Sequence, residues 1–364
     1  MAVERALARV DLGAIERNCA RLRRSLADGA ELCVVVKADG YGHGAVPSAR
    51  AALAGGASWI AVATASEAAE LRAAEIGARL LVMGALTSAE LDVALGAHAD
   101  VVAWTPELAD AAVASGLRVH VKYDSGMGRL GTADPAEARS LVERVAAGGQ
   151  LAGLMTHFAT ADQTGDDHFP AQLERFRELV ESVRADQPGV VVHAANSAAT
   201  LRDPEAHFDM VRCGVAAYGL DPFQRDPGEQ GLRPALSLHS YVAAVKRFEP
   251  GESAGYGRTW KATAPTWLAT IPIGYGDGWR RALTNNAEVL VRGRRHPLVG
   301  TVSMDNITVD LGPEGDAEAG DRAVLIGEQD GERILCEEVA NRLGTINYEI
   351  TCGLSSRVPR RYDP

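Results

Sequence analysis

The chain has 364 residues, a length that allows either two domains or one barrel with a smaller second unit. Hydrophobic residues make up 46% and charged residues 23%, as in ordinary globular proteins, which excludes the disordered, collagen-like and coiled-coil classes. The net charge of −11 argues against a general surface for nucleic acids or anionic membranes.

The sequence contains no targeting or cross-linking signal. The N-terminal stretch carries charges at Glu4, Arg5, Arg9 and Asp11, so it lacks the apolar core of a secretion signal, and no apolar run reaches membrane-spanning length. The five cysteines are scattered and form no C-x-x-C, so they indicate neither a disulfide framework nor a metal site. We therefore predict a cytoplasmic protein without a metal.

Short apolar segments alternate with helical patterns through the first two thirds of the chain. A helix is predicted from Asp11 to Asp28, followed by a strand that contains Val34 to Val36 and ends at Lys37. Seven further strands are predicted at 59–63, 80–83, 101–104, 119–123, 151–158, 190–193 and 210–216.

Helix start signals separate these strands. Thr64-x-x-Glu67 and Thr87-x-x-Glu90 are capping boxes, and Thr105 precedes a proline at a first helical position. Longer amphipathic helices are predicted at 135–147 and 170–185. Eight strands alternating with helices over about 200 residues predict a (β/α)₈ barrel. A doubly wound open sheet is the alternative, although no G-x-G-x-x-G follows the first strand.

The pattern changes after Leu232. Strands without intervening helices are predicted at 235–248, 267–272, 288–291, 307–311 and 323–326, and only 336–343 looks helical. We therefore predict a barrel domain over residues 11–232 and a mainly β domain over residues 233–364. Residues 1–10 are expected to pair with the second domain.

Candidate functional residues fall at the C-terminal ends of the barrel strands, where parallel barrels build their active sites. A lysine at the end of a buried strand, such as Lys37, loses a proton readily and can form an imine. The other polar residues at this end are Lys122, Arg129, His157, Asn196, Ser197 and Arg212. Each alone has an ordinary explanation as a core histidine, a helix cap or an ion-pair partner, but their joint position at one mouth indicates a site.

A phosphate site is predicted at the same mouth. Barrels often bind phosphate with the loops after strands seven and eight, where Ser197 and the backbone N–H groups near Gly214 and Val215 lie. Tyr41 adds a phenolic donor. An imine-forming lysine, phosphate donors and an arginine together suggest pyridoxal phosphate. A phosphorylated-sugar enzyme with a Schiff-base lysine is the alternative.

Longer motifs resemble those of the alanine racemase family. The members of this family are barrel-fold (fold type III) pyridoxal phosphate enzymes. The motifs run in the family order through nearly the whole chain and read VVVKADGYGHG, VKYDSGMGRLG, LMTHFA, HAANS, VRCGVAAYG, GYGRTW, IPIGYGDGW, VGTVSMDNITVD and NYEITCGLSSRVPR. The resemblance implies an isomerase that interconverts L-alanine and D-alanine and works as a homodimer with shared active sites.

The resemblance also implies roles for matching positions. Lys37 would hold the cofactor and act as base on one face of the substrate α-carbon, and Tyr256 of the partner subunit would act on the other face. His157 would hydrogen-bond Tyr256 and connect it to Arg212, which would face the pyridine nitrogen. Because arginine keeps its proton, that nitrogen should stay unprotonated and the ring should be a weaker electron sink, which disfavours transamination.

Further roles concern the substrate and the phosphate. Arg129 and the backbone N–H of Met304, again from the partner subunit, would bind the substrate carboxylate, while Lys122 would be carbamylated and orient Arg129. Tyr275 and Tyr348 would narrow the entrance. The remaining cofactor contacts implied by the resemblance are Tyr41, Asn196, Ser197, Gly214, Val215 and Tyr348. Ser303 departs from the cysteine common in the family, but the carboxylate contact there is made by backbone.

Other functions stay open at this point. A serine racemase or a racemase of broad specificity would share these motifs. A barrel-type amino-acid decarboxylase is disfavoured by GYGRTW and by the lack of a triple-glycine phosphate loop. A non-catalytic pyridoxal phosphate-binding protein would consist of a barrel alone, so the second domain argues against it.

Overall fold

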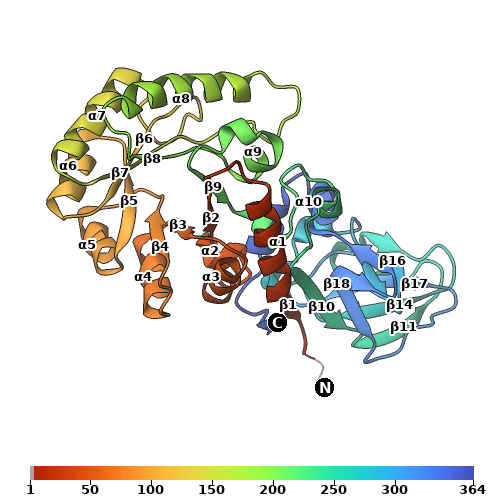
Figure 1. The fold of residues 1–364 in the computed structure, drawn as a ribbon. Coiled ribbons are helices and arrows are strands. Elements are labelled where there is room, and N and C mark those ends of the chain that lie inside the picture. Colours follow the sequence, from red (N-terminus) through yellow and green to blue (C-terminus); the bar gives the residue numbers. More distant parts are fainter. Residues whose placement is uncertain (1–3) are drawn as a thin grey trace. The chain divides into compact units, whose positions relative to one another are not determined.

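The structure is a computed structural model that describes residues 4–364, so the first three residues of the segment predicted to pair with the second domain lie outside it (Figure 1). Its residues form two compact units. One unit contains Ile15–Ala217 and Gln230–Leu232, and we call it the barrel unit. The other contains the segment up to Ala14, Tyr218–Glu229 and Arg233–Pro364, and we call it the β unit.

The barrel unit has eight parallel strands that form a closed barrel, as predicted. Their hydrogen bonds join each strand to the next, and the last pairs with the first. The strands are β2 (Glu31–Val35), β3 (Trp59–Val62), β4 (Arg79–Val82), β5 (Ala99–Ala103), β6 (Val119–Lys122), β7 (Leu151–Met155), β8 (Val191–His193) and β9 (Met210–Cys213). Their side chains are almost all buried, which explains their continuous apolar text.

One helix precedes the first barrel strand and helices follow strands β2 to β8, all of them outside the barrel (Figure 1). Thr64 and Glu67 form the predicted capping box, and the Thr105 hydroxyl accepts from the Leu108 N–H at 3.3 Å. The helices are α1 (Leu12–Arg24), α2 (Lys37–Tyr41), α3 (Ala45–Ala54), α4 (Ala65–Ala73), α5 (Ser88–Gly96), α6 (Pro106–Ala114), α7 (Pro135–Ala147), α8 (His168–Arg184) and α9 (Ser197–Arg202).

Three predicted elements in this unit, one helix and two strands, extended too far at their C-terminal ends. The first helix ends at Arg24 and not at Asp28, because the Ser25 hydroxyl donates to the Leu22 carbonyl at 2.7 Å and competes with the helical pattern. Strands β7 and β9 end at Met155 and Cys213, several residues before the predicted ends. The residues that follow them leave the barrel wall and form the site described below.

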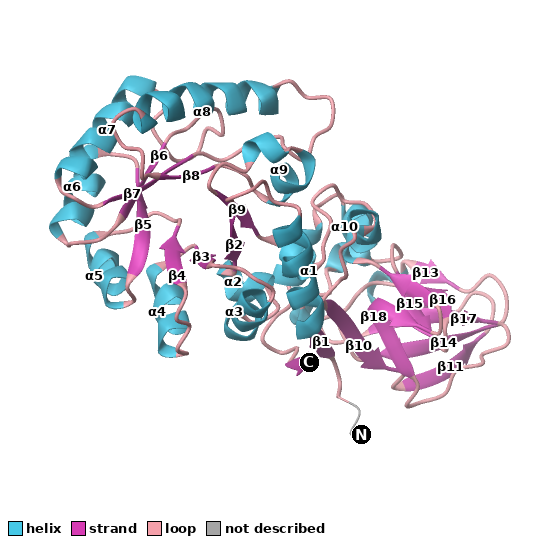
Figure 2. Ribbon diagram, in the orientation of Figure 1, coloured by secondary structure: helices cyan, strands magenta, loops and turns pink. Residues whose placement is uncertain are grey.

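The β unit consists of two main sheets and a strand pair (Figure 2). The larger sheet has the order β16-β15-β18-β10-β1-β20, with β19 on β18, and the second has the order β11-β14-β17. The strands are β1 (Leu7–Asp11), β10 (Leu236–Tyr241), β11 (Ala244–Phe248), β12 (Ser253–Ala254), β13 (Trp260–Lys261), β14 (Thr266–Ile271), β15 (Glu288–Val291), β16 (Arg294–Pro297), β17 (Ile307–Gly312), β18 (Arg322–Gln329), β19 (Glu332–Ile334) and β20 (Arg360–Asp363).

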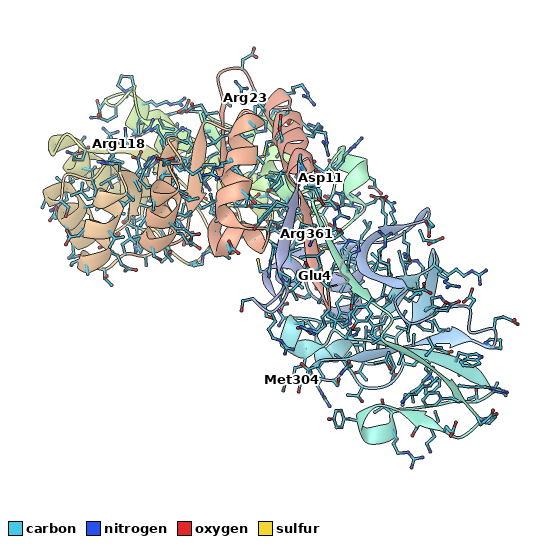
Figure 3. All side chains as sticks on the ribbon, turned by 90° about the horizontal axis from the view of Figure 1, so that it is seen from below. Glu4, Asp11, Arg23, Arg118, Met304 and Arg361 are labelled. Atoms are coloured by element: carbon cyan, nitrogen blue, oxygen red, sulfur yellow. The ribbon has the colours of Figure 1, made fainter. Side chains whose placement is uncertain are left out.

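The chain termini meet in the larger sheet. Strand β1 pairs antiparallel with β10 and parallel with β20. An ion pair between Arg361 and Glu4, at 2.7 Å, reinforces this edge (Figure 3). The N-terminal strand is therefore a structural part of the β unit.

Two predictions for this unit were wrong. The stretch predicted as one strand over 235–248 forms two, β10 and β11, which belong to different sheets. Besides α10 (Cys336–Leu343), a second helix, α11 (Asn347–Cys352), is present. Tertiary contacts stabilise this short helix: the buried Asn347 amide donates to the Glu337 carboxylate and the Asp221 carbonyl, both at 2.8 Å. Across residues 4–364, no helix combines the length and apolarity that a membrane crossing needs.

Candidate active site

Five of the predicted residues line one cavity at the C-terminal ends of the barrel strands. The cavity has a volume of about 190 Å³, and these five residues are Lys37, Lys122, Arg129, His157 and Arg212. The rest of its lining is Ala63, Met83, Gly84, Leu130 and Met155. Four of the lining side chains are cationic and none is acidic, so the cavity suits an anionic ligand. Lys37 and Lys122 are two of the chain's four lysines, the others being Lys246 and Lys261.

Lys37 lies beyond the end of strand β2. The prediction that the strand extends to Lys37 was therefore wrong. Strand β2 stops at Val35, and Lys37 begins the short segment α2, in which Ala38, Asp39 and Gly40 have φ between 52° and 62°. Such left-handed backbone costs about 1 kcal/mol for each residue that is not glycine. The Glu67 carboxylate holds this turn by accepting from the Ala38 N–H at 2.7 Å. Glu67 therefore fixes the backbone next to Lys37.

Arg212 is buried and has no carboxylate partner among residues 4–364. Its Nη1 donates to His193 Nδ1 at 2.7 Å, and its Nη2 lies near the carbonyls of Thr156 (2.8 Å) and Ala194 (2.9 Å) and near His157 Nδ1 (3.1 Å). Burial lowers the pKa of Arg212 to about 10, so the guanidinium stays charged at neutral pH. These bonds hold the guanidinium in one orientation and leave its Nε–H without a partner in the described chain.

The hydrogen bond from Arg212 determines the proton position on His157. Arg212 Nη2 has two hydrogens for three acceptors, so it shares one of them with His157 Nδ1; because arginine only donates, Nδ1 accepts and the neutral ring carries its proton on Nε2. Burial and the charge of Arg212 hold the pKa of His157 well below its usual value, which keeps the ring neutral. His157 therefore presents an N–H donor from Nε2.

Lys122 and Arg129 occupy the part of the cavity after β6. The Lys122 side chain is buried, and burial together with the charges of Arg212 and Arg129 lowers its pKa to about 8. Arg129 is exposed, on a loop held by the Asp124 carboxylate, which accepts from the N–H groups of Met127 (2.6 Å) and Gly128 (2.9 Å). Asp124 offsets the neighbouring positive charges only in part, so Lys122 and Arg129 still repel each other.

The predicted phosphate residues meet on one side of the barrel mouth. The Ser197 hydroxyl accepts from the N–H of Gly214 at 3.0 Å and of Ala216 at 3.3 Å. A Cβ at Gly214 would lie 2.8 Å from Cζ of Tyr41 and overlap its hydroxyl, so glycine makes room for this phenol. Asn196 caps α9 by accepting from the Ala199 N–H at 3.0 Å. Val215, also buried, begins the 3₁₀ turn that follows.

If this side of the mouth holds the phosphate of the pyridoxal phosphate that the family resemblance implies, Gly214→Ala should weaken its binding at least about tenfold, since displacement of one hydrogen-bonding group costs about 1.4 kcal/mol. The added methyl group displaces the Tyr41 hydroxyl, while the backbone of residue 214 needs no positive φ. Absorbance titration of the apoprotein with pyridoxal phosphate measures the effect. Gly77→Ala is the control, because its Cβ meets no atom within 4 Å. Equal affinity of both variants would contradict a ligand contact at Tyr41 and Gly214.

The other predicted residues belong to the β unit. The side chains of Tyr256, Met304 and Tyr275 are exposed by 75%, 51% and 41%, although all three are large and mostly apolar (Figure 3 labels Met304). Tyr348 is partly buried at the start of α11.

Backbone contacts within the β unit hold these exposed residues in place. The Thr301 hydroxyl donates to the Tyr256 carbonyl at 2.6 Å, and the Gly276 N–H donates to the Met304 carbonyl at 2.9 Å. Asp305, next to Met304, pairs with Arg357 at 2.6 Å. These contacts fix the backbone at Tyr256 and Met304, whose side chains remain exposed.

The sequence analysis missed several residues that position the site. They are Glu67, Asp124, Thr156 and His193. Only His193 has a recognisable signal, since a histidine inside an otherwise apolar barrel strand needs a buried partner.

Comparisons with known proteins identify the family of this chain. Residues 10–222 match the alanine racemase N-terminal domain, and residues 235–362 match the alanine racemase C-terminal domain. The chain belongs to the alanine racemase family. Alanine racemase of Geobacillus stearothermophilus is 44% identical, with 97% of this chain and 92% of that protein covered. Alanine racemase of Symbiobacterium thermophilum is 42% identical, with 98% of this chain and 96% of that protein covered.

Solved alanine racemases have the same fold. The crystal structure of alanine racemase from E. faecalis matches with a TM-score of 0.93 and 38% identity, covering all of both chains. That from Streptomyces coelicolor matches with a TM-score of 0.92 and 39% identity, covering 98% of this chain and 97% of the other. The chain is therefore an isomerase, and racemisation of alanine is the reaction that its alanine racemase relatives indicate.

Proposed function

We propose that the protein interconverts L-alanine and D-alanine with pyridoxal 5′-phosphate, using Lys37 and the partner subunit's Tyr256 as two bases. The observation that carries this proposal is the acid-free cavity in which Lys37 lies beside His157 and the buried Arg212. We assign cofactor binding to the domain predicted over residues 11–232, and the second base to the domain predicted over residues 233–364.

The residues present fit pyridoxal phosphate. Lys37 offers an amine for the aldehyde, while Tyr41, Ser197, Gly214 and Val215 supply donors for the phosphate. The unpartnered Nε–H of Arg212 suits an unprotonated ring nitrogen. Asn196 and Tyr348 complete the proposed contacts. When bound, this cofactor withdraws electrons and acidifies the α-C–H bond of an amino acid.

Racemisation requires proton transfer on both faces of the α-carbon. In one direction Lys37 Nζ removes the α-proton while Tyr256 Oη delivers one from the opposite face, and in the other direction the roles exchange. The Nε2–H of His157 would donate to the Tyr256 oxygen. A hydrogen bond to the charged form stabilises the phenolate and helps a phenol of ordinary pKa about 10 act as a base.

The same arrangement selects a small amino acid. Arg129 matches the two oxygens of the substrate carboxylate, with the backbone N–H of Met304 from the partner subunit as a further donor. Tyr275 and Tyr348 would close the entrance around a methyl side chain. The exposure of Tyr256, Tyr275 and Met304 supports a homodimer in which these residues reach the partner's cavity.

Lys122 is proposed to be carbamylated, which removes the repulsion between two cations. The neutral amine attacks carbon dioxide, forms an N–C bond and releases a proton, so the product carboxylate can orient Arg129. With a pKa of about 8, the neutral fraction of Lys122 at pH 7.4 is about one fifth, against about a thousandth for an ordinary lysine.

At a fixed concentration of dissolved carbon dioxide, we expect the carbamate on Lys122 to increase as the pH rises through 8, because only the unprotonated amine reacts. Carbon-13 NMR with labelled bicarbonate would detect it. Lys122→Met should lose the signal, and Lys261→Met, which replaces an exposed lysine, should keep it. If the protein without any substitution gave no carbamate signal, the proposal would be contradicted.

The substrate is tested by incubating the purified holoenzyme with single L-amino acids and separating the enantiomers by chiral chromatography. We expect fast formation of D-alanine and much slower conversion of L-serine. Equal turnover of several long side chains would favour the broad-specificity alternative. Release of carbon dioxide and an amine would instead identify a decarboxylase.

A further inference from the structure

A chain of hydrogen-bonded side chains crosses the interior of the barrel unit from Arg212 to Asp100. Arg212 Nη1 lies 2.7 Å from His193 Nδ1, and His193 Nε2 lies 2.8 Å from His120 Nδ1. His120 Nε2 lies 3.3 Å from Oδ2 of Asp100. All four side chains are at most 3% exposed, so water does not compete for these bonds. Because these buried polar side chains have no water to bind, they must hydrogen-bond to one another.

The donor of each link can be assigned. Arginine has no acceptor, so Arg212 donates to His193 Nδ1, and the neutral His193 ring carries its proton on Nε2. His193 then donates to His120 Nδ1, and His120 donates from Nε2 to the Asp100 carboxylate. Burial lowers the pKa of both histidines, so both stay neutral. The chain therefore runs in one direction, from a cation to an anion.

Asp100 anchors this chain at the end of the barrel opposite the cavity. It is the second residue of β5, and Arg118 and Arg79, near the starts of β6 and β4, donate to its carboxylate at 2.6 Å and 3.0 Å (Figure 3 labels Arg118). Burial alone would raise the pKa of Asp100, but the hydrogen bond from His120 and the charge of Arg118 hold it below its usual value. Asp100 is therefore ionised.

The backbone is shaped to admit the His120 ring. A Cβ at Gly153 of β7 would lie 2.6 Å from Cε1 of His120 and overlap Nδ1, so only glycine leaves room for the ring. The pairing of β6 with β7 also shifts between Val119 and His120, which brings His120 opposite Gly153. These two local features are independent of the hydrogen bonds, yet both accommodate the same link.

The chain of hydrogen bonds gives the buried, charged guanidinium of Arg212 a fixed acceptor. A buried guanidinium costs several kcal/mol unless it is compensated, and Arg212 has no acid beside it in the described chain. Arg79 and Arg118 are 40% and 50% exposed, so water screens their charges. The link from Asp100 through His120 and His193 is dry. Arg118 and Arg79 contact the Asp100 carboxylate directly, so what the chain transmits to Arg212 is mainly the direction of its hydrogen bonds.

We propose that Asp100 is a positioning residue for Arg212, acting through His120 and His193 across the whole barrel. From the face opposite the cavity it fixes the tautomers of both histidines, so that His193 Nδ1 stays an acceptor and the guanidinium keeps one orientation. The consequence for catalysis rests on the proposed role of Arg212 against the cofactor ring. Substrate binding by Arg129 does not involve this chain.

The test compares Asp100→Asn with Arg118→Gln in the holoenzyme. Asparagine keeps an acceptor but removes the charge, and we expect a fall in kcat of about tenfold, or 1.4 kcal/mol in the barrier, at nearly constant KM for alanine. Arg118→Gln removes an ion pair of Asp100 but leaves the chain, and kcat should stay within about twofold. Equal effects of both variants on kcat would overturn the proposal, because they would indicate a structural role only.

A second variant breaks the chain without changing a polar group. Gly153→Ala should displace His120, whereas Gly189→Ala, whose Cβ meets no atom within 4 Å, should not. Nitrogen-15 NMR of histidine-labelled protein should show His120 and His193 protonated on Nε2, and Gly153→Ala should shift both signals. If the signals shift but kcat does not fall, the proposal is wrong.

The two readouts separate this proposal from the proposed function. The histidine spectra test the chain whether or not alanine is racemised. If Asp100→Asn does not fold, Gly153→Ala decides between the outcomes. A protein that shows the chain by NMR but converts no alanine would disprove the function and leave the arrangement of Arg212 intact.

Discussion

Replacement of Lys37 by alanine is expected to reduce racemisation by about four orders of magnitude, because it would remove both the proposed covalent anchor of the cofactor and one of the two proposed bases. The fold should persist, since the turn that begins at Lys37 is held by the Ala38–Glu67 hydrogen bond. Kinetics with both enantiomers of alanine, together with thermal unfolding, measure the two effects.

The matched control is Lys246→Ala, which removes an exposed lysine of β11. Borohydride reduction followed by peptide mapping should place the attached cofactor on Lys37 alone among the chain's four lysines. Attachment to Lys122, or a Lys37→Ala variant that keeps most of its activity, would show that the cavity works in another way.

Tyr256→Phe is expected to lower kcat/KM by about 10²- to 10⁴-fold in both directions, since it would remove the oxygen proposed to transfer the proton on one face. Lys37 would still exchange the α-proton that faces it. In deuterated water one enantiomer of alanine should therefore acquire α-deuterium without inversion. Tyr362→Phe, at an exposed tyrosine of β20, is the control and should leave both reactions unchanged.

Mixing the two inactive variants tests whether the sites are shared between subunits. In a mixed dimer, one site combines Lys37 from one subunit with Tyr256 from the other, and the second site has neither. Random exchange makes half of the dimers mixed with one intact site each, so about a quarter of the original activity should return. No recovery after exchange would place Lys37 and Tyr256 in the same subunit's site.

The barrel could be predicted because the sequence signals of its strands and helices lie within a few neighbouring residues. Buried parallel strands read as apolar runs, and Thr64 and Thr105 mark helix starts through hydrogen bonds made within three residues. The helix α11 could not be found this way, since its stability comes from contacts between Asn347 and the distant Glu337 and Asp221. Sequence spacing does not contain such contacts.

The site was predictable to a similar degree. Residues on strand ends, such as Lys122 and Arg212, follow from the barrel geometry and do line one cavity. The left-handed turn after Lys37 and the tautomer of His157 depend on Glu67 and Arg212, which approach from other strands. Tyr256 was named only through the family resemblance, because nothing in its own surroundings distinguishes it from an ordinary exposed tyrosine.

The most direct test of the two-base account follows the α-hydrogen during the first turnovers of L-alanine in deuterated water. With one base on each face, the removed proton and the delivered one differ. We therefore expect D-alanine that is almost fully α-deuterated while the recovered L-alanine is still largely protonated. D-alanine that retains the original α-hydrogen in a large fraction would contradict the account, because a single group would then carry the proton from one face to the other.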